Sequence, residues 1–177
     1  HSPRRRRSRR WAPAPSPRTP AAGKSTLAAR LDARLREAHV PAVVLDSDDL
    51  REVLVPRPGH EPEARDGFYQ TLAGLAALLA RRGLVVVVAA TAHRRAWRDR
   101  ARALAPRYLE VYVATPLAEC RARDPKGLYG SPAVLAQLPG GGVAYEPPLH
   151  PDVVAPHGDD PQVVDAVLAR LEIGGLG

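Results

Sequence analysis

The sequence predicts a three-layer α/β domain with a mainly parallel sheet, and three observations support this fold class. Helical and strand patterns alternate along the 177-residue chain from Ser25 onward. The run from Leu84 to Ala90 is apolar at every position, which is typical of a strand covered on both faces at the centre of a sheet. A second apolar run, from Ala42 to Leu45, ends in acidic residues, at the edge where such sheets bind ligands.

The other elements follow from residue spacing and from residues that start or stop helices. Apolar residues three and four apart predict a first helix from Ser25 to about Ala38. The elements expected after the strand at 42–45 are a helix from about Glu63 to Arg82 that stops at Gly83, a charged helix from Arg95 to Leu104, a strand from Leu109 to Val113, a short helix from Pro116 to Arg123, a strand from Asp152 to Val154, and a final helix capped by Asp160.

Composition indicates one domain, spanning residues 19–177, preceded by a basic tail at residues 1–18 that we expect to be disordered. Seven of the 26 basic residues lie in that tail, which has no acid, so 26 − 7 = 19 basic residues face 19 acidic ones in the rest of the chain. A single cysteine, Cys120, predicts a reducing, cytoplasmic setting. No apolar run approaches the ~20 residues that cross a bilayer, so we expect no membrane association.

The string Gly23-Lys24-Ser25-Thr26 predicts a phosphate-binding loop at the start of the first helix. We expect Ala22 to Thr26 to bind ATP, with Lys24 on the β- and γ-phosphates as a catalytic residue and Ser25 on Mg²⁺. The alternative is an ordinary helix start with Ser25 or Thr26 as its cap. Arg18 stands where the motif has its first glycine, and prolines fill the segment before it, so the first strand is expected to be missing or replaced.

Two aspartates, Asp46 and Asp48, follow the strand at 42–45. If the chain stays extended, both face the crevice, where one carboxylate binds metal and the other accepts a proton from the acceptor hydroxyl. The strand at 84–90 ends without an acid, so Asp48 is expected to help hold the metal. Alternatively, Asp46 and Asp49 only cap a helix.

Arginines divide into two expected groups. Arg51 and Arg65 are candidates for binding an anionic acceptor. The other group is expected to form one solvated face of the charged helix: Arg94, Arg95, Arg98, Arg100 and Arg102.

Several strings give the chain a resemblance to one known family. They are Arg123 to Tyr129, Tyr145 to Pro148, Asp46 to Arg51, Pro62 to Arg65, and Arg98 to Arg102. From about Thr19 to Val154 the chain resembles the adenylylsulfate kinases, P-loop enzymes that use ATP to phosphorylate the ribose 3′-hydroxyl of adenylylsulfate.

The resemblance implies the P-loop NTPase fold, Mg²⁺ with ATP, and nucleotides as substrates. It makes Asp48 the base and metal-side carboxylate, and it assigns substrate binding to Asp46, Arg51, Arg65, Lys126 and Leu128. Lys126 would lie on a mobile lid at about 124–150 that excludes water from the transferring phosphate. A homodimer is left open.

Departures from the family pattern cluster where acceptor specificity is expected. Ala92-His93-Arg94 replaces Ser-Pro-Tyr, Phe68 replaces an asparagine, His60 replaces an aromatic residue, and the uncharged run Gly130 to Ala133 replaces a basic stretch. These changes keep two alternatives open: a P-loop kinase for another small-molecule acceptor, and a catalytically impaired nucleotide-binding homologue.

Residues 1–18 have three interpretations. They form a basic tail that binds nucleic acid, they replace the first strand in an impaired kinase, or they come from out-of-frame reading of GC-rich DNA. Nucleic-acid binding is the weakest, because a lone Trp11 offers little base stacking. The out-of-frame hypothesis is preferred.

Overall fold

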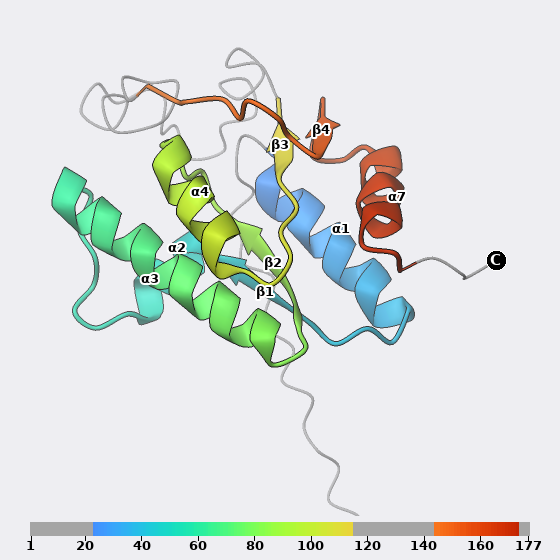
Figure 1. The fold of residues 1–177 in the computed structure, drawn as a ribbon, viewed down its shortest axis with the longest axis horizontal. Coiled ribbons are helices and arrows are strands. Elements are labelled where there is room, and N and C mark those ends of the chain that lie inside the picture. The colour runs from blue at the N-terminus through green and yellow to red at the C-terminus, as the bar shows by residue number, and fades with distance from the viewer. Residues whose placement is uncertain (1–22, 115–143, 174–177) are drawn as a thin grey trace, which may run out of the picture.

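The structure is a computed structural model that describes residues 23–114 and 144–173 (Figure 1). Its elements are α1 (Lys24–Glu37), β1 (Ala42–Asp46), α2 (Ser47–Val53), α3 (Pro62–Arg81), β2 (Val85–Ala89), α4 (Arg95–Leu104), β3 (Val111–Val113), β4 (Val153–Ala155) and α7 (Pro161–Arg170). None of these described helices combines the length and apolar character needed to cross a bilayer. The tail at 1–18, the helix expected at 116–123 and most of the expected lid lie outside the described residues.

The strands form two parallel pairs, which confirms the predicted α/β class with parallel strands. β1 pairs with β2 from Ala42 opposite Val85 to Asp46 opposite Ala89. β3 pairs with β4, with Val111 opposite Val153. Because the strands of each pair run in the same direction, their carboxyl ends meet at one edge.

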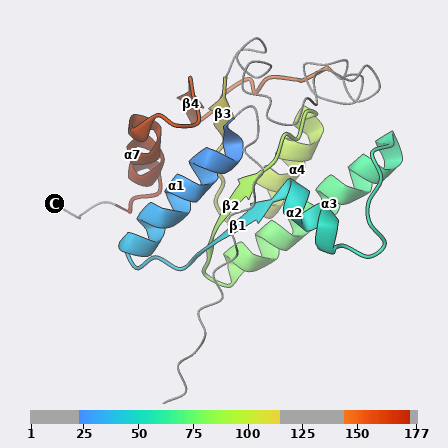
Figure 2. The same cartoon turned by 180° about the vertical axis from the view of Figure 1, so that it is seen from behind.

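The helices cover the strands on two sides. The opposite views in Figures 1 and 2 place α1 and α7 on one side of the strands and α3 and α4 on the other. α3 packs against β2 and against α4, while α1 packs against both β1 and β2. The arrangement is the expected three-layer one.

The largest part of the core lies under α1. Buried residues of α1, β4 and α7 form one cluster: Leu27, Leu31, Leu35, Val153, Ala155, Val163, Val164, Val167 and Leu168. Leu35 is fully buried, and burial of each such leucine contributes about 1.5–3 kcal/mol to the free energy of unfolding. Half-buried valines of β2 and β3 pack against the same cluster. The first helix therefore joins the two strand pairs.

The expectation that β2 lies at the sheet centre, covered on both faces, is wrong within the described residues. β2 pairs only with β1, and the Val88 side chain is 43% exposed. No described strand lies between β2 and β3 to hydrogen-bond to both. The first strand would lie within residues 1–22, outside the described residues, so its absence or replacement stays a prediction.

Candidate active site

The phosphate-loop glycine is held by another glycine distant in sequence. Gly23 has φ 76°, a left-handed conformation that favours glycine, and its carbonyl accepts the first α1 hydrogen bond from Leu27 at 3.0 Å. A Cβ atom on Gly158 would lie 2.1 Å from the Gly23 carbonyl oxygen. The two backbones are therefore in direct contact. Sequence reasoning missed Gly158, although a glycine soon after the last strand was a usable signal.

A chain of two hydrogen bonds connects the start of α1 with the start of α2. The Ser25 hydroxyl donates to Asp46 Oδ2 at 2.5 Å, and the other oxygen of that carboxylate accepts from the Asp48 backbone N–H at 2.9 Å. Asp46 thus caps α2 while it binds the phosphate-loop serine. Lys24 precedes Ser25 in the chain and Asp48 donates its backbone N–H, so both residues lie next to this hydrogen-bond chain.

Asp48 does not sit in an extended segment, which corrects one expectation. α2 begins at Ser47, directly after the strand, because the Asp46 side chain accepts the Asp48 N–H. Asp48 consequently lies in the first turn of a helix, where its carboxylate is exposed and favourably placed for the helix dipole. Of the two proposed caps, Asp46 is the N-cap of α2 and Asp49 is within the first turn.

The oxygen atoms at this point suit Mg²⁺. Mg²⁺ takes hard oxygen ligands, commonly one or two carboxylates together with phosphate oxygens and water. The Ser25 hydroxyl and the Asp46 carboxylate supply two such ligand groups side by side. Within the described residues there is no group of three or more His, Cys, Asp or Glu side chains that could hold a metal by itself. The hydroxyl and the carboxylate can therefore hold a metal ion together with phosphate oxygens.

Arg51 is a buried cation in a defined orientation. Arg51 is only 8% exposed, and its Nη1 donates to the carbonyls of Gly59 at 2.9 Å and Pro58 at 3.5 Å. Its guanidinium carbon lies 3.9 Å from the centre of the Phe68 ring. Burial lowers the pKa of Arg51, and the interactions with Tyr69 and Asp48 oppose this shift. A cation fixed this way can bind an anion at a constant position.

Further charges gather around Arg51. Arg65, half-buried on α3, interacts electrostatically with Arg51 and Tyr69. Burial lowers the pKa of His93, and the charge of Arg65 lowers it further, so His93 favours its neutral form. The structure thus brings Asp48, Arg51 and Arg65 into one electrostatic neighbourhood that attracts anions.

Arg98 does not lie on a solvated helix face as predicted. Its side chain is 10% exposed and its Nε donates to Glu110, 14% exposed, at 2.7 Å. The other nitrogens donate to the carbonyls of Ala92 at 2.6 Å and Glu146 at 2.5 Å. The guanidinium is satisfied by three segments outside α4, which the helical pattern alone cannot reveal. Arg95 and Arg102 of α4 pair nearer the surface, as expected for a charged face.

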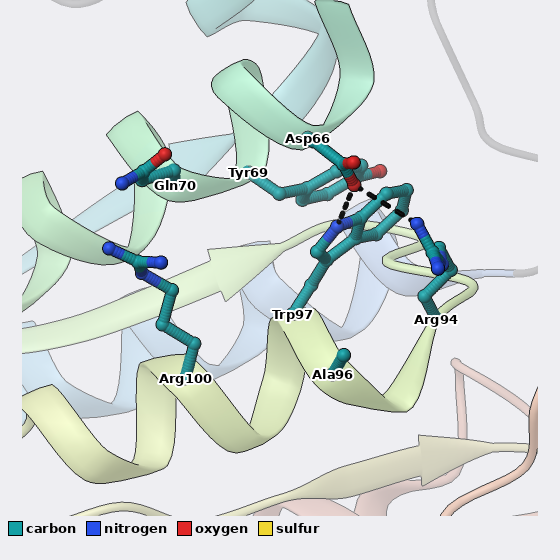
Figure 3. Close-up of a pocket in the computed structure, with 7 residues that line it drawn as sticks. All are labelled: Asp66, Tyr69, Gln70, Arg94, Ala96, Trp97 and Arg100. Atoms are coloured by element: carbon teal, nitrogen blue, oxygen red, sulfur yellow. Dashed lines mark hydrogen bonds and ion pairs between the residues drawn. The ribbon is translucent and has the colours of Figure 1, made fainter. Parts of the chain in front are cut away.

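A cavity of about 400 Å³ opens between α3 and α4 (Figure 3). Tyr69, which interacts with Arg51, lines it. Tyr69 and Trp97 stack there with ring centres 4.2 Å apart, and Asp66 accepts hydrogen bonds from the Trp97 indole at 2.6 Å and from Arg94 at 3.2 Å. Figure 3 shows Asp66 directed toward the indole nitrogen, with the Tyr69 ring against the indole. Sequence reasoning did not single out Tyr69 or Trp97, because neither belongs to a motif.

The fold and the site define the class of P-loop phosphotransferases. A glycine-lysine-serine turn opens a helix next to a parallel strand, and carboxylates, the buried Arg51 and the half-buried Arg65 lie around the carboxyl edge of that strand. A family model described as adenylylsulphate kinase matches residues 18–156. The chain belongs to the adenylylsulphate kinase family.

Individual relatives agree with this assignment. The adenylyl-sulfate kinase of Chloroflexus aurantiacus is 42% identical over 155 residues, which are 85% of this chain and 83% of the relative. A probable adenylyl-sulfate kinase of Pyrococcus abyssi is 37% identical, with 81% of each chain covered. The solved structure of the Mycobacterium tuberculosis APS kinase CysC in complex with AMPPNP and APS has a TM-score of 0.76 and 32% identity, covering 86% of this chain and 92% of that chain.

Part of the predicted site lies within the described residues. Gly23, Lys24, Ser25 and Thr26 are at the start of α1, and Asp46, Asp48, Arg51 and Arg65 follow around the carboxyl end of β1. Ala22, Lys126 and Leu128 lie outside the described residues, so their roles stay predictions.

Proposed function

We propose that this chain transfers the γ-phosphoryl group of ATP to the 3′-hydroxyl of adenylylsulfate, which gives 3′-phosphoadenylylsulfate. The observation that carries the proposal is the Ser25–Asp46–Asp48 connection. Over two hydrogen bonds, it joins the turn that suits a triphosphate to the backbone of Asp48, the residue whose carboxylate suits an alcohol. Membership of the adenylylsulphate kinase family supports the choice of acceptor.

In this mechanism the nucleotide phosphates lie at the amino end of α1. Backbone N–H groups and the helix dipole attract the phosphates, and Lys24 neutralises charge on the β- and γ-oxygens. Ser25 and Asp46 would hold Mg²⁺, which neutralises negative charge on the transferred group when it is bound. The Ser25 hydroxyl, which now donates to Asp46, would turn its lone pair toward the metal.

The acceptor lies on the α2 and α3 side. The exposed Asp48 carboxylate accepts the proton of the attacking hydroxyl, and Arg51 and Arg65 bind the anionic part of the acceptor. Arg51 brings little orientational freedom to this task, because Phe68 and two carbonyls already fix it. Binding therefore costs less side-chain entropy than binding by a solvated arginine.

The test is turnover of the purified chain with ATP, Mg²⁺ and adenylylsulfate, followed by mass spectrometry for ADP and the 3′-phosphorylated nucleotide. We expect both products in equal amounts. Asp48→Asn should reduce kcat by about 10²- to 10⁴-fold, the usual contribution of general-base catalysis. Asp99→Asn, an exposed carboxylate on α4, is the matched control and should leave kcat unchanged.

The same assay separates the alternatives. Turnover with another anionic or hydroxylated acceptor, but not with adenylylsulfate, would reject the proposed acceptor and keep the kinase class. The aromatic Phe68 beneath Arg51, where the family pattern has an asparagine, is the observation that favours that outcome. Binding of ATP without any turnover would reject the proposal in favour of an impaired homologue.

A further inference from the structure

Tyr69 occupies a connecting position that the proposed mechanism does not use. It lies on α3, directly after the buried Phe68, and its hydroxyl accepts a hydrogen bond from the Ala92 backbone N–H at 3.2 Å. Ala92 comes three residues after β2 ends, at the same edge as the carboxylates that follow β1. One phenol therefore bridges α3 and the turn after β2.

The turn at Ala92 needs this support. Ala92 has φ 39°, within the left-handed region that residues other than glycine rarely adopt. Such a conformation persists only where surrounding contacts impose it, and it is found disproportionately at functional sites. Here the contacts come from both sides, because Ala92 donates to Tyr69 and its carbonyl accepts from Arg98.

The aromatic ring of Tyr69 is held as firmly as its hydroxyl. Trp97 stacks on it at 4.2 Å with an interplanar angle of 18°, and Phe68 meets it edge-on at 5.2 Å. The Trp97 indole is in turn fixed by its hydrogen bond to Asp66 (Figure 3) and by the edge contact of His93 at 4.7 Å. The hydroxyl therefore has little freedom to move.

Tyr69 also borders the proposed acceptor site. The Arg51 guanidinium carbon lies 3.9 Å from the centre of the Phe68 ring, and that ring meets Tyr69 edge-on at 5.2 Å. The interaction with Tyr69 also opposes the lowering of the Arg51 pKa by burial. Tyr69 therefore supports the ring on which the cation rests.

We propose that Tyr69 is a positioning residue for the acceptor: its hydroxyl holds the Ala92 turn, and its ring, stacked on Trp97, supports the Phe68 ring on which the Arg51 guanidinium lies. The ligand class is an anionic nucleotide held by Arg51. This inference rests on the proposed function, since it concerns the acceptor of that reaction.

The first experiment compares Tyr69→Phe with the wild type. The change removes one oxygen and keeps the stacked ring. We expect KM for adenylylsulfate to rise about tenfold, the size of one lost hydrogen bond, while kcat and KM for ATP change less than about threefold. Tyr108→Phe removes the same atom before β3, at the opposite end of the strands, and should leave all three constants unchanged.

A second pair of variants tests the ring contact independently. Trp97→Leu keeps the Tyr69 hydroxyl but removes its stacking partner, so KM for adenylylsulfate should again rise. Trp97→Phe restores an aromatic face and should recover a KM within about threefold of the wild type. Both variants lack the indole hydrogen bond to Asp66. If only Trp97→Phe recovers KM, the effect of Trp97→Leu comes from the lost ring contact and not from that hydrogen bond.

The outcomes separate this inference from the function on which it rests. No turnover of adenylylsulfate by the wild type would overturn the proposed function, and with it this inference. Normal wild-type turnover with an unchanged KM in Tyr69→Phe would overturn the inference alone. A parallel fall in kcat, in kcat/KM for both substrates and in the thermal unfolding midpoint of Tyr69→Phe would also overturn it, because that pattern indicates a merely structural tyrosine.

Discussion

The phosphate side and the acceptor side of the site are built by different means. On the phosphate side, Gly23 and Gly158 bring two backbones into contact, and the Ser25 hydroxyl donates to Asp46. On the acceptor side, Arg51 and Tyr69 are held by stacked rings and buried hydrogen bonds. The phosphate side therefore depends on the absence of side chains, whereas the acceptor side depends on their identity. Side-chain substitutions on the acceptor side can therefore change acceptor specificity without changing how ATP reacts.

The largest expected effect concerns the support of the acceptor side. Arg98→Leu takes the buried partner from the Glu110 carboxylate and leaves it only Arg102, at 3.2 Å, so the loss should lie near the lower end of the about 3–5 kcal/mol that breaking a buried pair costs. Chemical denaturation should show this loss in the free energy of unfolding. Arg94→Leu removes an exposed partner of Asp66 and should cost no more than about 1 kcal/mol. Equal losses in the two variants would mean that Arg98 is solvated after all.

The next effect concerns the phosphate side. Gly158→Ala introduces a methyl group 2.1 Å from the Gly23 carbonyl, so the phosphate loop must move. Overpacking typically costs about 1–3 kcal/mol, which in binding is about a 5- to 150-fold loss of ATP affinity. Calorimetric titration of Gly158→Ala and the wild type with a non-hydrolysable ATP analogue measures this loss of affinity.

Gly74→Ala is the matched control for that experiment. Gly74 lies on α3, and a Cβ atom there meets nothing within 4 Å. The change should leave ATP affinity unchanged and stabilise the helix by about 0.5–1 kcal/mol. Full ATP affinity in Gly158→Ala would show that the loop tolerates displacement.

A smaller effect tests whether side-chain identity matters on the acceptor side. Arg51→Lys keeps the charge but replaces a planar fork with a single ammonium group. We expect KM for adenylylsulfate to rise about tenfold, near the 1.5 kcal/mol of one charged hydrogen bond, with KM for ATP unchanged. Arg57→Lys, at an exposed position, is the control. If KM for ATP rose instead, the division of the site into two sides would be wrong.

The smallest effect is a pH dependence from His93. Its pKa is lowered in the folded state, chiefly by burial, so between that value and 6.5 the unfolded chain binds the extra proton. The stability contributed by the neutral ring is complete above pH 6.5 and is lost as pH falls through the folded pKa. The slope cannot exceed about 1.4 kcal/mol per pH unit. The free energy of unfolding of His93→Gln should depend less on pH between 7.5 and 5.5 than that of the wild type. Identical slopes for the two proteins would show that His93 is not the source of the pH dependence.

Local patterns predicted most of the fold. The spacing of Leu27, Leu31 and Leu35 identified the buried face of α1, and Asp160 caps α7 through the Gln162 N–H, as expected. The family resemblance is confirmed by the family model. These predictions succeeded because each depends on residues within a few positions of one another.

The rest of the site depends on contacts between distant segments. Arg98 is buried because Ala92, Glu110 and Glu146 converge on it, and no spacing along α4 encodes that convergence. The extended geometry expected for Asp48 was wrong for a local reason. Asp46 was available as a cap and further acids follow it, a pattern that favours a helix start directly after the strand.

The separation of the two strand pairs should be visible in amide hydrogen exchange. Val85 donates its N–H to Pro41, so alternation directs the amides of Val87 and Ala89 toward β1 and those of Val86 and Val88 away from it. On β3, Ala114 donates to Ala155, which directs the amide of Val113 away from β4. Exchange rates should therefore alternate along each strand of the two described pairs, with slow amides facing the partner strand and fast amides facing away from it.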